Sequence, residues 1–152
     1  MKPSEMADPG QDSRREQGHR LAPHTADCII EAWGPDRVSC FVEAMQALVE
    51  IFADVSDETV SRALPVSAER ASDADLLVSL LEDEIYTIDV FGVVPVRFHL
   101  ADTEDGGVAG DMEVVEASGV ELVGPVPKAV SYHGLEMAEE GGGWRCRVVV
   151  DV

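Results

Sequence analysis

The sequence predicts an α/β protein of the α+β type, in which two helices cover one face of a largely antiparallel mixed sheet as a two-layer sandwich. Two segments, residues 37–54 and 73–89, have apolar residues at helical spacing along a single stripe. Residues 94–100 instead alternate between apolar and other side chains, which is typical of a half-buried strand. Helices with one apolar stripe each must cover a sheet, and this combination favours the sandwich.

The two helices have start signals as well as periodicity. Pro35 and Asp36 precede the first helix, whose apolar positions are Phe41, Ala44, Met45, Leu48, Val49 and Phe52. Ser72 and Asp75 resemble a capping box at the start of the second helix, with Asp in place of the usual Glu. Its apolar stripe consists of Leu76, Leu77, Leu80, Leu81, Ile85 and Ile88.

The strands are predicted from short β-rich runs between turn residues. The first run, Cys28 to Trp33, is stopped by Gly34 and Pro35. Pro95 places the alternating strand at a sheet edge or at a bulge, because proline cannot donate a ladder hydrogen bond. Further strands are expected at 60–68, 108–116, 120–124, 128–137 and 144–152, the last two joined by a glycine-rich turn at 139–143.

A chain of 152 residues is near the usual size of one domain. Residues 1–18 are rich in polar residues, Pro and Gly without apolar periodicity, and we expect a flexible tail ahead of a folded domain at 19–152. No run approaches the roughly 18 apolar residues that a membrane span needs, and the N-terminus lacks the apolar stretch of a secretory signal. A cytoplasmic protein that does not bind membranes is therefore expected.

The composition is strongly acidic. Eleven Lys and Arg stand against thirty Asp and Glu, a formal net charge of −19. Such a charge repels phosphate backbones and anionic lipids, so strong direct nucleic-acid binding is not expected. It favours cations or a basic protein surface as partners, although an acidic surface can also serve only to keep a protein soluble.

No known catalytic template is present. The sequence lacks a Walker loop, a GxGxxG turn after a strand, a GxSxG elbow and an HExxH helix. Its three cysteines, Cys28, Cys40 and Cys146, are scattered and form no CxxC pair, which argues against a disulfide framework and a zinc site. Cys28 lies four residues from His24, so a cysteine nucleophile is conceivable, but buried core thiols are the simpler interpretation. We predict no catalytic residue.

Two carboxylates occupy unusual positions. Asp27 opens the first predicted strand, where Asp is disfavoured, and Asp151 ends the apolar final strand one residue before the terminal Val152. If the two strand ends meet, both side chains and the α-carboxylate of Val152 could bind a hard divalent cation, calcium or magnesium. The alternative is that Asp27 only accepts a hydrogen bond from a turn and that Asp151 is a solvated strand end.

Two histidines are further candidate functional residues. His24 begins the segment HTAD that leads into Asp27, and His133 lies in the predicted strand at 128–137. A lone strand histidine is more often structural than catalytic, so both interpretations of His133 stay open.

Four segments together resemble the archease family. They are HTAD at 24–27, the helix pattern LLxxLLxxxIY at 76–86, KAVSYHGLEM at 128–137 and the terminal WRCRVVVDV at 144–152. The resemblance spans residues 20–152. Differences from the common pattern are the absence of a His within 119–127, the sequence SLLEDEIYTID on the second helix, and Ser131 where Thr is usual.

This resemblance implies a function in RNA ligation without implying an enzyme. Archeases are accessory proteins of the GTP-dependent RtcB-type RNA ligase of tRNA splicing and processing, and they promote guanylylation of the ligase and its multiple turnover. In the family a metal is bound by the Asp of HTAD, the penultimate Asp and the terminal residue, which correspond to Asp27, Asp151 and Val152. A chaperone-like interaction module without a metal-dependent role is the alternative, and a hydrolase using the Asp27 and Asp151 pair is a third hypothesis. The sequence gives no oligomeric state.

Overall fold

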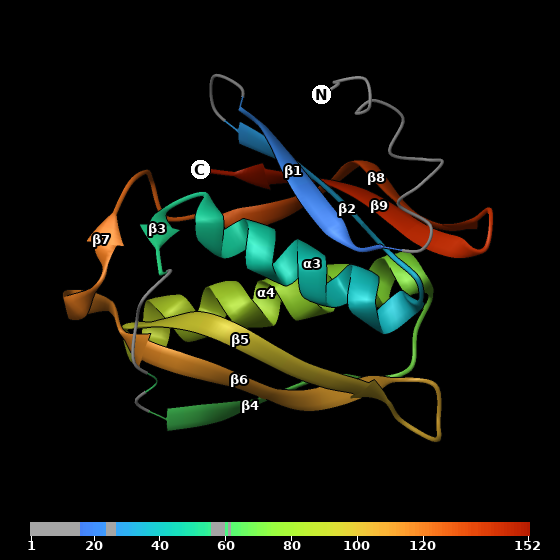
Figure 1. Ribbon diagram of the computed structural model, residues 1–152, viewed down its shortest axis with the longest axis horizontal. Coiled ribbons are helices and arrows are strands. Elements are labelled where there is room, and N and C mark those ends of the chain that lie inside the picture. The colour runs from blue at the N-terminus through green and yellow to red at the C-terminus, as the bar shows by residue number, and fades with distance from the viewer. Residues whose placement is uncertain (1–15, 24–26, 56–59, 61) are drawn as a thin grey trace.

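The computed structural model describes residues 16–23, 27–55, 60 and 62–152. Within these residues, the chain forms two α-helices, nine strands and one 3₁₀ turn (Figure 1). In chain order the elements are β1 (Gly18–Pro23), β2 (Asp27–Gly34), α3 (Arg37–Glu50), β3 (Ala53–Asp54), β4 (Arg62–Ala68), α4 (Asp73–Phe91), β5 (Val93–Asp102), β6 (Val108–Glu116), the 3₁₀ turn η1 (Ala117–Gly119), β7 (Glu121–Leu122), β8 (Ala129–Glu140) and β9 (Gly143–Asp151).

The strands pair in antiparallel fashion throughout and form two main sheets. One has the order β1-β2-β9-β8, the other β4-β6-β5, and β3 pairs with β7 in a short separate ladder. Both helices contact strands of both main sheets, so the helices lie between the sheets (Figure 1). The predicted α+β sandwich is confirmed, with the strands divided between two sheets instead of one. Each helix therefore needs apolar residues on more than one side, and eight residues of α4 are buried.

The two helices begin where the sequence indicates. Asp36 caps α3, with its side chain accepting from the backbone of Ser39 while the Ser39 hydroxyl lies 3.2 Å from the Asp36 backbone nitrogen. Ser72 caps α4 by accepting from the backbone nitrogen of Asp75. The end of α4 is fixed by Gly92, whose left-handed conformation (φ 65°) suits glycine. The first helix ends at Glu50, four residues before the predicted end.

The predicted strands are present, and two elements were missed. The register of β5 and β6 shifts between Pro95 and Arg97, so Pro95 lies at an irregularity on an edge strand as expected. We did not predict β1, because its sequence GHRLAP has little apolar alternation. We also did not predict the two-residue strand β3. The first strand is held in place by pairing with β2 and by contacts with α3.

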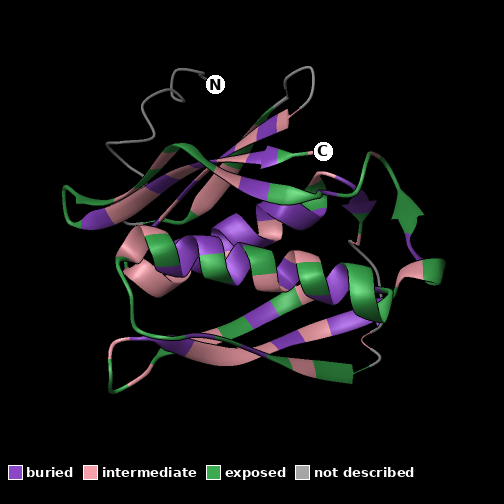
Figure 2. Ribbon diagram, turned by 180° about the vertical axis from the view of Figure 1, so that it is seen from behind, coloured by how far each residue is buried: buried purple, intermediate pink, exposed green. Residues whose placement is uncertain are grey.

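The core fills the space between the two sheets and the helices (Figure 2). Alternate residues of β2 and β9 point inward, including Ile30, Ala32, Val148 and Val150, and they meet the buried faces of the helices. Among the described residues, no helix is long and apolar enough to cross a membrane.

Candidate functional site

Asp27 and Asp151 are directly opposite each other on adjacent antiparallel strands. The register of β2 and β9 pairs Asp27 with Asp151 and continues to Gly34 and Trp144. On its other side, Asp151 pairs with Ala129 of β8. Two residues that are 124 positions apart are thus brought to the same end of the four-stranded sheet. The meeting of the two strand ends, which the sequence left as a condition for a shared cation site, is present in the structure.

Both carboxylates lie on the outer face of this sheet. Side chains alternate along a strand, and the neighbours Cys28 and Val150 are buried toward the helices. Asp27 is half-buried and Asp151 is exposed. Two carboxylates on one face of adjacent strands supply oxygen ligands of the kind that a hard cation binds.

The backbone at the end of β9 is fixed by Lys128. The backbone nitrogen of Lys128 donates to the carbonyl oxygen of Asp151 over 2.8 Å. The half-buried Val152 follows immediately after Asp151. Sequence reasoning did not single out Lys128, because only the strand pairing shows that it lies beside the chain end.

The donor set fits a hard cation in chemistry but relies on the chain end. Within the residues that the structure covers, no group of three or more His, Cys, Asp or Glu side chains is arranged to hold a metal ion. Asp27 and Asp151 supply two carboxylates, and the third ligand expected from the family resemblance is the terminal residue Val152. Such an all-oxygen set suits calcium or magnesium. His24 lies outside the described residues.

His133 lies on an irregular part of β8, away from the two aspartates. The pairing of β8 with β9 shifts register between Ser131 and Glu136, and the backbone nitrogen of His133 donates to the Ser131 hydroxyl over 3.0 Å. Gly134 has a φ of 74°, and its carbonyl accepts from the Arg147 guanidinium. His133 lies four positions along the chain from Ala129, the partner of Asp151. The exposed His133 is therefore not part of the Asp27 and Asp151 pair.

The cysteines lie in or beside the core. Cys28, Cys40 and Cys146 are all free and buried, as the sequence predicts. Burial raises the pKa of Cys28, and contact with the Cys146 thiol together with burial raises the pKa of Cys40. Since the thiolate is the nucleophile, these shifts disfavour cysteine catalysis.

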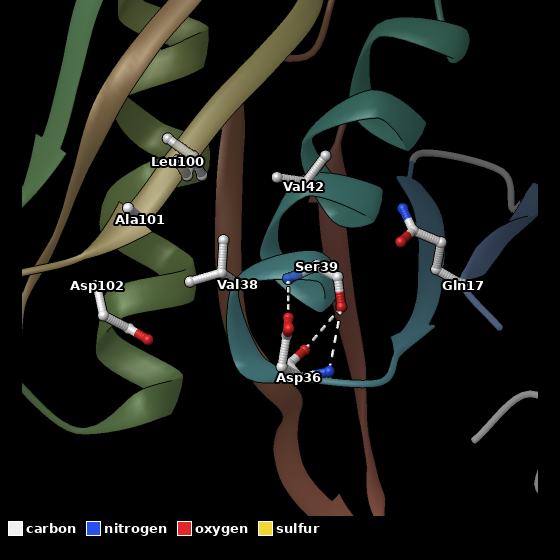
Figure 3. A pocket seen from close by; sticks show the side chains of 8 residues that line it. All are labelled: Gln17, Asp36, Val38, Ser39, Val42, Leu100, Ala101 and Asp102. Atoms are coloured by element: carbon white, nitrogen blue, oxygen red, sulfur yellow. Dashed lines mark hydrogen bonds between the residues drawn. The ribbon is translucent and has the colours of Figure 1, made fainter. Parts of the chain in front are cut away.

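A hollow of about 450 Å³ lies between the start of α3 and the end of β5 (Figure 3). It is lined by Gln17, Asp36, Val38, Ser39, Val42, Leu100, Ala101 and Asp102. Its polar groups are already engaged, because Asp36 and Ser39 cap the helix and Asp102 contacts Arg37. The hollow therefore presents no set of free acid, base and nucleophile, and it is formed by elements other than the strand ends that carry Asp27 and Asp151.

The whole domain matches one known family. Residues 19–152 match the profile described as "Archease protein family (MTH1598/TM1083)". The chain belongs to the archease family. A curated relative named "Probable protein archease" from Mycobacterium tuberculosis is 44% identical over 137 residues, covering 89% of this chain and 75% of the relative. "Protein archease" from Methanosarcina mazei is 30% identical over 139 residues, covering 85% of this chain and 92% of the relative.

Solved archease folds agree with this assignment. The solution structure of Methanobacterium thermoautotrophicum protein 1598 superposes with a TM-score of 0.73 at 25% identity, covering 89% of this chain and 99% of that one. A Thermotoga maritima crystal structure described as "an archease, possible chaperone" has a TM-score of 0.62 at 20% identity, covering 88% and 96%. The second comparison shows the shared fold alone.

Proposed function

We propose that this archease-family protein is an accessory protein of a GTP-dependent RtcB-type RNA ligase, whose guanylylation and multiple turnover it promotes in tRNA splicing. In this proposal Asp27, Asp151 and the terminal carboxylate of Val152 bind a divalent cation, calcium or magnesium. The direct cross-strand pairing of Asp27 with Asp151 is the observation that carries the proposal. It makes the family's expected ligand positions neighbours in this chain.

In this proposal the protein holds a divalent cation at a fixed position at one end of the four-stranded sheet. The pairing of β2 with β9, together with the bond from Lys128 to the Asp151 carbonyl, keeps the carboxylates at one sheet end. A bound divalent ion would supply positive charge able to neutralise a nucleotide triphosphate. The exposed position of Asp151 leaves room for a partner's groups on the solvent side.

The partner is expected to be basic. A net charge of −19 draws the protein toward positively charged surfaces and speeds encounter with them. An RNA ligase needs such a surface to bind its substrate, whereas RNA itself would be repelled. This division explains how an acidic protein could assist RNA chemistry without binding RNA.

The decisive experiment is multiple-turnover RNA ligation by the cognate ligase at limiting GTP and divalent metal, with and without this protein. Stimulation by wild type that is lost in Asp151→Asn would support the role and the site together. Asp111→Asn is the matched control, because Asp111 lies half-buried on β6 in the other main sheet. The absence of stimulation by folded wild-type protein would reject the proposal.

A chaperone-like interaction module is the second candidate. The words "possible chaperone", used of the Thermotoga maritima relative, favour it. In that case the protein would bind several basic proteins equally well in the presence of a chelator. Loss of binding on chelation would instead favour the metal-dependent role.

A further inference from the structure

Four of the exposed large apolar side chains among the described residues lie on the outer side of α4 and on the neighbouring strand β8, and three others, Leu122, Val123 and Val126, lie on and after β7. Tyr86, Val90 and Phe91 in the last turns of α4 are 58%, 52% and 49% exposed, and Tyr132 of β8 is 61% exposed. Tyr86 and Val90 are four residues apart and therefore share one face of the helix. We call these four residues and the surface they occupy the α4–β8 face (Figure 2 shows the exposed stripe of α4 with β8 beside it).

The α4–β8 face lies between the edges of the two main sheets. Helix α4 contacts β8, an edge strand of the four-stranded sheet, and β4, an edge strand of the three-stranded sheet. Its outer side is thus framed by two sheet edges and covered by neither, which leaves the aromatic residues accessible. Tyrosine and phenylalanine are enriched in protein interfaces and often dominate their binding energy.

The edge of β8 is poorly suited to adding another strand. The register shift between Ser131 and Glu136 and the positive φ of Gly134 interrupt the regular edge beside Tyr132. Bulges of this kind protect edge strands from pairing with other chains. A partner would therefore contact this face through side chains, with Tyr132 displayed by the irregular segment.

The electrostatic background of the face is strongly acidic. The segment 73–91 that forms α4 contains five Asp or Glu residues besides the buried Glu84 and no Lys or Arg, and the segment 129–140 that forms β8 contains three Glu and no Lys or Arg. The nearest arginines on β9 are engaged, since Arg145 lies 3.6 Å from Glu140 and Arg147 donates to the Gly134 carbonyl. Apolar side chains on such a background match a surface on which apolar groups alternate with Lys and Arg.

We propose that the α4–β8 face is the surface through which this protein docks on a basic protein partner, with Tyr86 and Tyr132 as the main anchors. The inference rests on the proposed function in taking the RNA ligase as that partner. It assigns the two surfaces different roles. Asp27 and Asp151 affect turnover of the ligase, and the α4–β8 face determines the affinity for the ligase. The two surfaces are connected, because β8 begins at Ala129, the residue that pairs with Asp151.

Binding of the purified ligase to the double variant Tyr86→Ser, Tyr132→Ser tests the proposal directly. Removing two interface anchors should weaken the Kd about tenfold or more. Leu122→Ser is the comparison variant, because Leu122 is 59% exposed but belongs to β7 and is not one of the four residues of the α4–β8 face. Circular dichroism with thermal unfolding checks that each variant is folded. Equal Kd values for the double variant and wild type would overturn the docking surface.

Titration of ligase turnover separates docking from the proposed function. The tyrosine variant should require about tenfold more protein for half-maximal stimulation yet reach the wild-type plateau, whereas Asp151→Asn should lower the plateau. If wild type stimulates the ligase and the tyrosine variant needs no more protein than wild type for half-maximal stimulation, the docking surface is rejected. The proposed function would then still stand. Wild-type protein that neither binds nor stimulates the ligase would reject both.

A charge reversal tests the expected character of the partner. Glu82 is exposed one turn before Tyr86 on α4, so Glu82→Lys should weaken binding at low salt and reduce its salt dependence. Unchanged affinity of Glu82→Lys at low salt, or wild-type affinity that does not fall with added salt, would contradict a basic partner on this face.

Discussion

The imidazole of His19 on β1 contacts the carboxylate of Glu43 on α3, with 2.8 Å between Nδ1 and Oε1. The other ring nitrogen, Nε2, lies 2.7 Å from Oε1 of Glu50, which is two helical turns further along α3. Glu43 also accepts from the side chain of Gln17 over 2.5 Å. This cluster fastens the edge strand β1 to the helix layer, in addition to the backbone pairing of β1 with β2.

The His19 cluster predicts a pH-dependent contribution to stability. The hydrogen bond to Glu43 raises the pKa of His19 from 6.5 to about 9, against the opposing effect of burial. Burial would raise the pKa of Glu43, but hydrogen bonds from His19 and Gln17 bring it below its ordinary value. The contribution of His19 is therefore complete below about pH 6.5 and is lost as the pH rises through about 9.

Urea unfolding of wild type and His19→Ala checks this prediction. The variant should be less stable by about 1–3 kcal/mol at pH 6, because two hydrogen bonds to carboxylates are lost. The difference should shrink markedly by pH 10. A difference that stays constant between pH 6 and pH 10 would contradict the raised pKa of His19.

Glu84 is predicted to destabilise the fold. It is fully buried on α4, and neither carboxylate oxygen has a hydrogen-bond partner among the described residues. Burial, with a smaller effect of the nearby Asp83, raises its pKa well above the ordinary 4.5. The folded state thus keeps a proton that the unfolded state releases, so this residue lowers stability as the pH rises above about 4.5.

Replacing this carboxyl with an apolar group of similar size should therefore stabilise the protein. We expect Glu84→Leu to raise the free energy of unfolding by about 1–3 kcal/mol at pH 8 and by less at pH 4. Glu82→Leu on the exposed side of the same helix should change it by no more than about 0.5 kcal/mol. A destabilised Glu84→Leu variant would show that the carboxyl has a stabilising partner.

Gly134 is predicted to be required for the irregular segment of β8. Its φ of 74° disfavours other residues, and an added Cβ would lie 2.7 Å from the Arg147 guanidinium nitrogen that binds its carbonyl. Gly142 also has a positive φ, but an added Cβ there would meet nothing within 4 Å. Thermal unfolding should show a cost of about 1 kcal/mol for Gly142→Ala and a larger one for Gly134→Ala. Equal costs would mean that the Arg147 contact is unimportant.

The buried thiols are predicted to react slowly. Cys28, Cys40 and Cys146 are all shielded from solvent, and a raised pKa leaves little of the reactive thiolate of Cys28 and Cys40. Titration of the native protein with a thiol-specific disulfide reagent should therefore proceed far more slowly than titration in urea, where three equivalents react. One rapidly reacting equivalent in the native state would identify an accessible thiol.

Much of the candidate site was visible in the sequence because its signals are local. Asp27 and Asp151 stand out as carboxylates at the ends of β-rich runs, and these runs form β2 and β9. The functional importance of Tyr86 and Tyr132 was not visible, because a tyrosine in an amphipathic pattern gives no sign of its exposure. Glu84 was likewise hidden, since a glutamate among leucines is expected to face solvent.

The sequence by itself determined the two helices, most of the strands and their turns. These depend on apolar periodicity, capping residues and glycines within a few positions of one another, as at Ser72 and Gly92. Only the tertiary structure decided the division of strands between two sheets, the pairing of Asp27 with Asp151 and the fastening of β1 through His19. Each of these depends on which distant segments bury their apolar faces together, and strand register is fixed only when that packing forms.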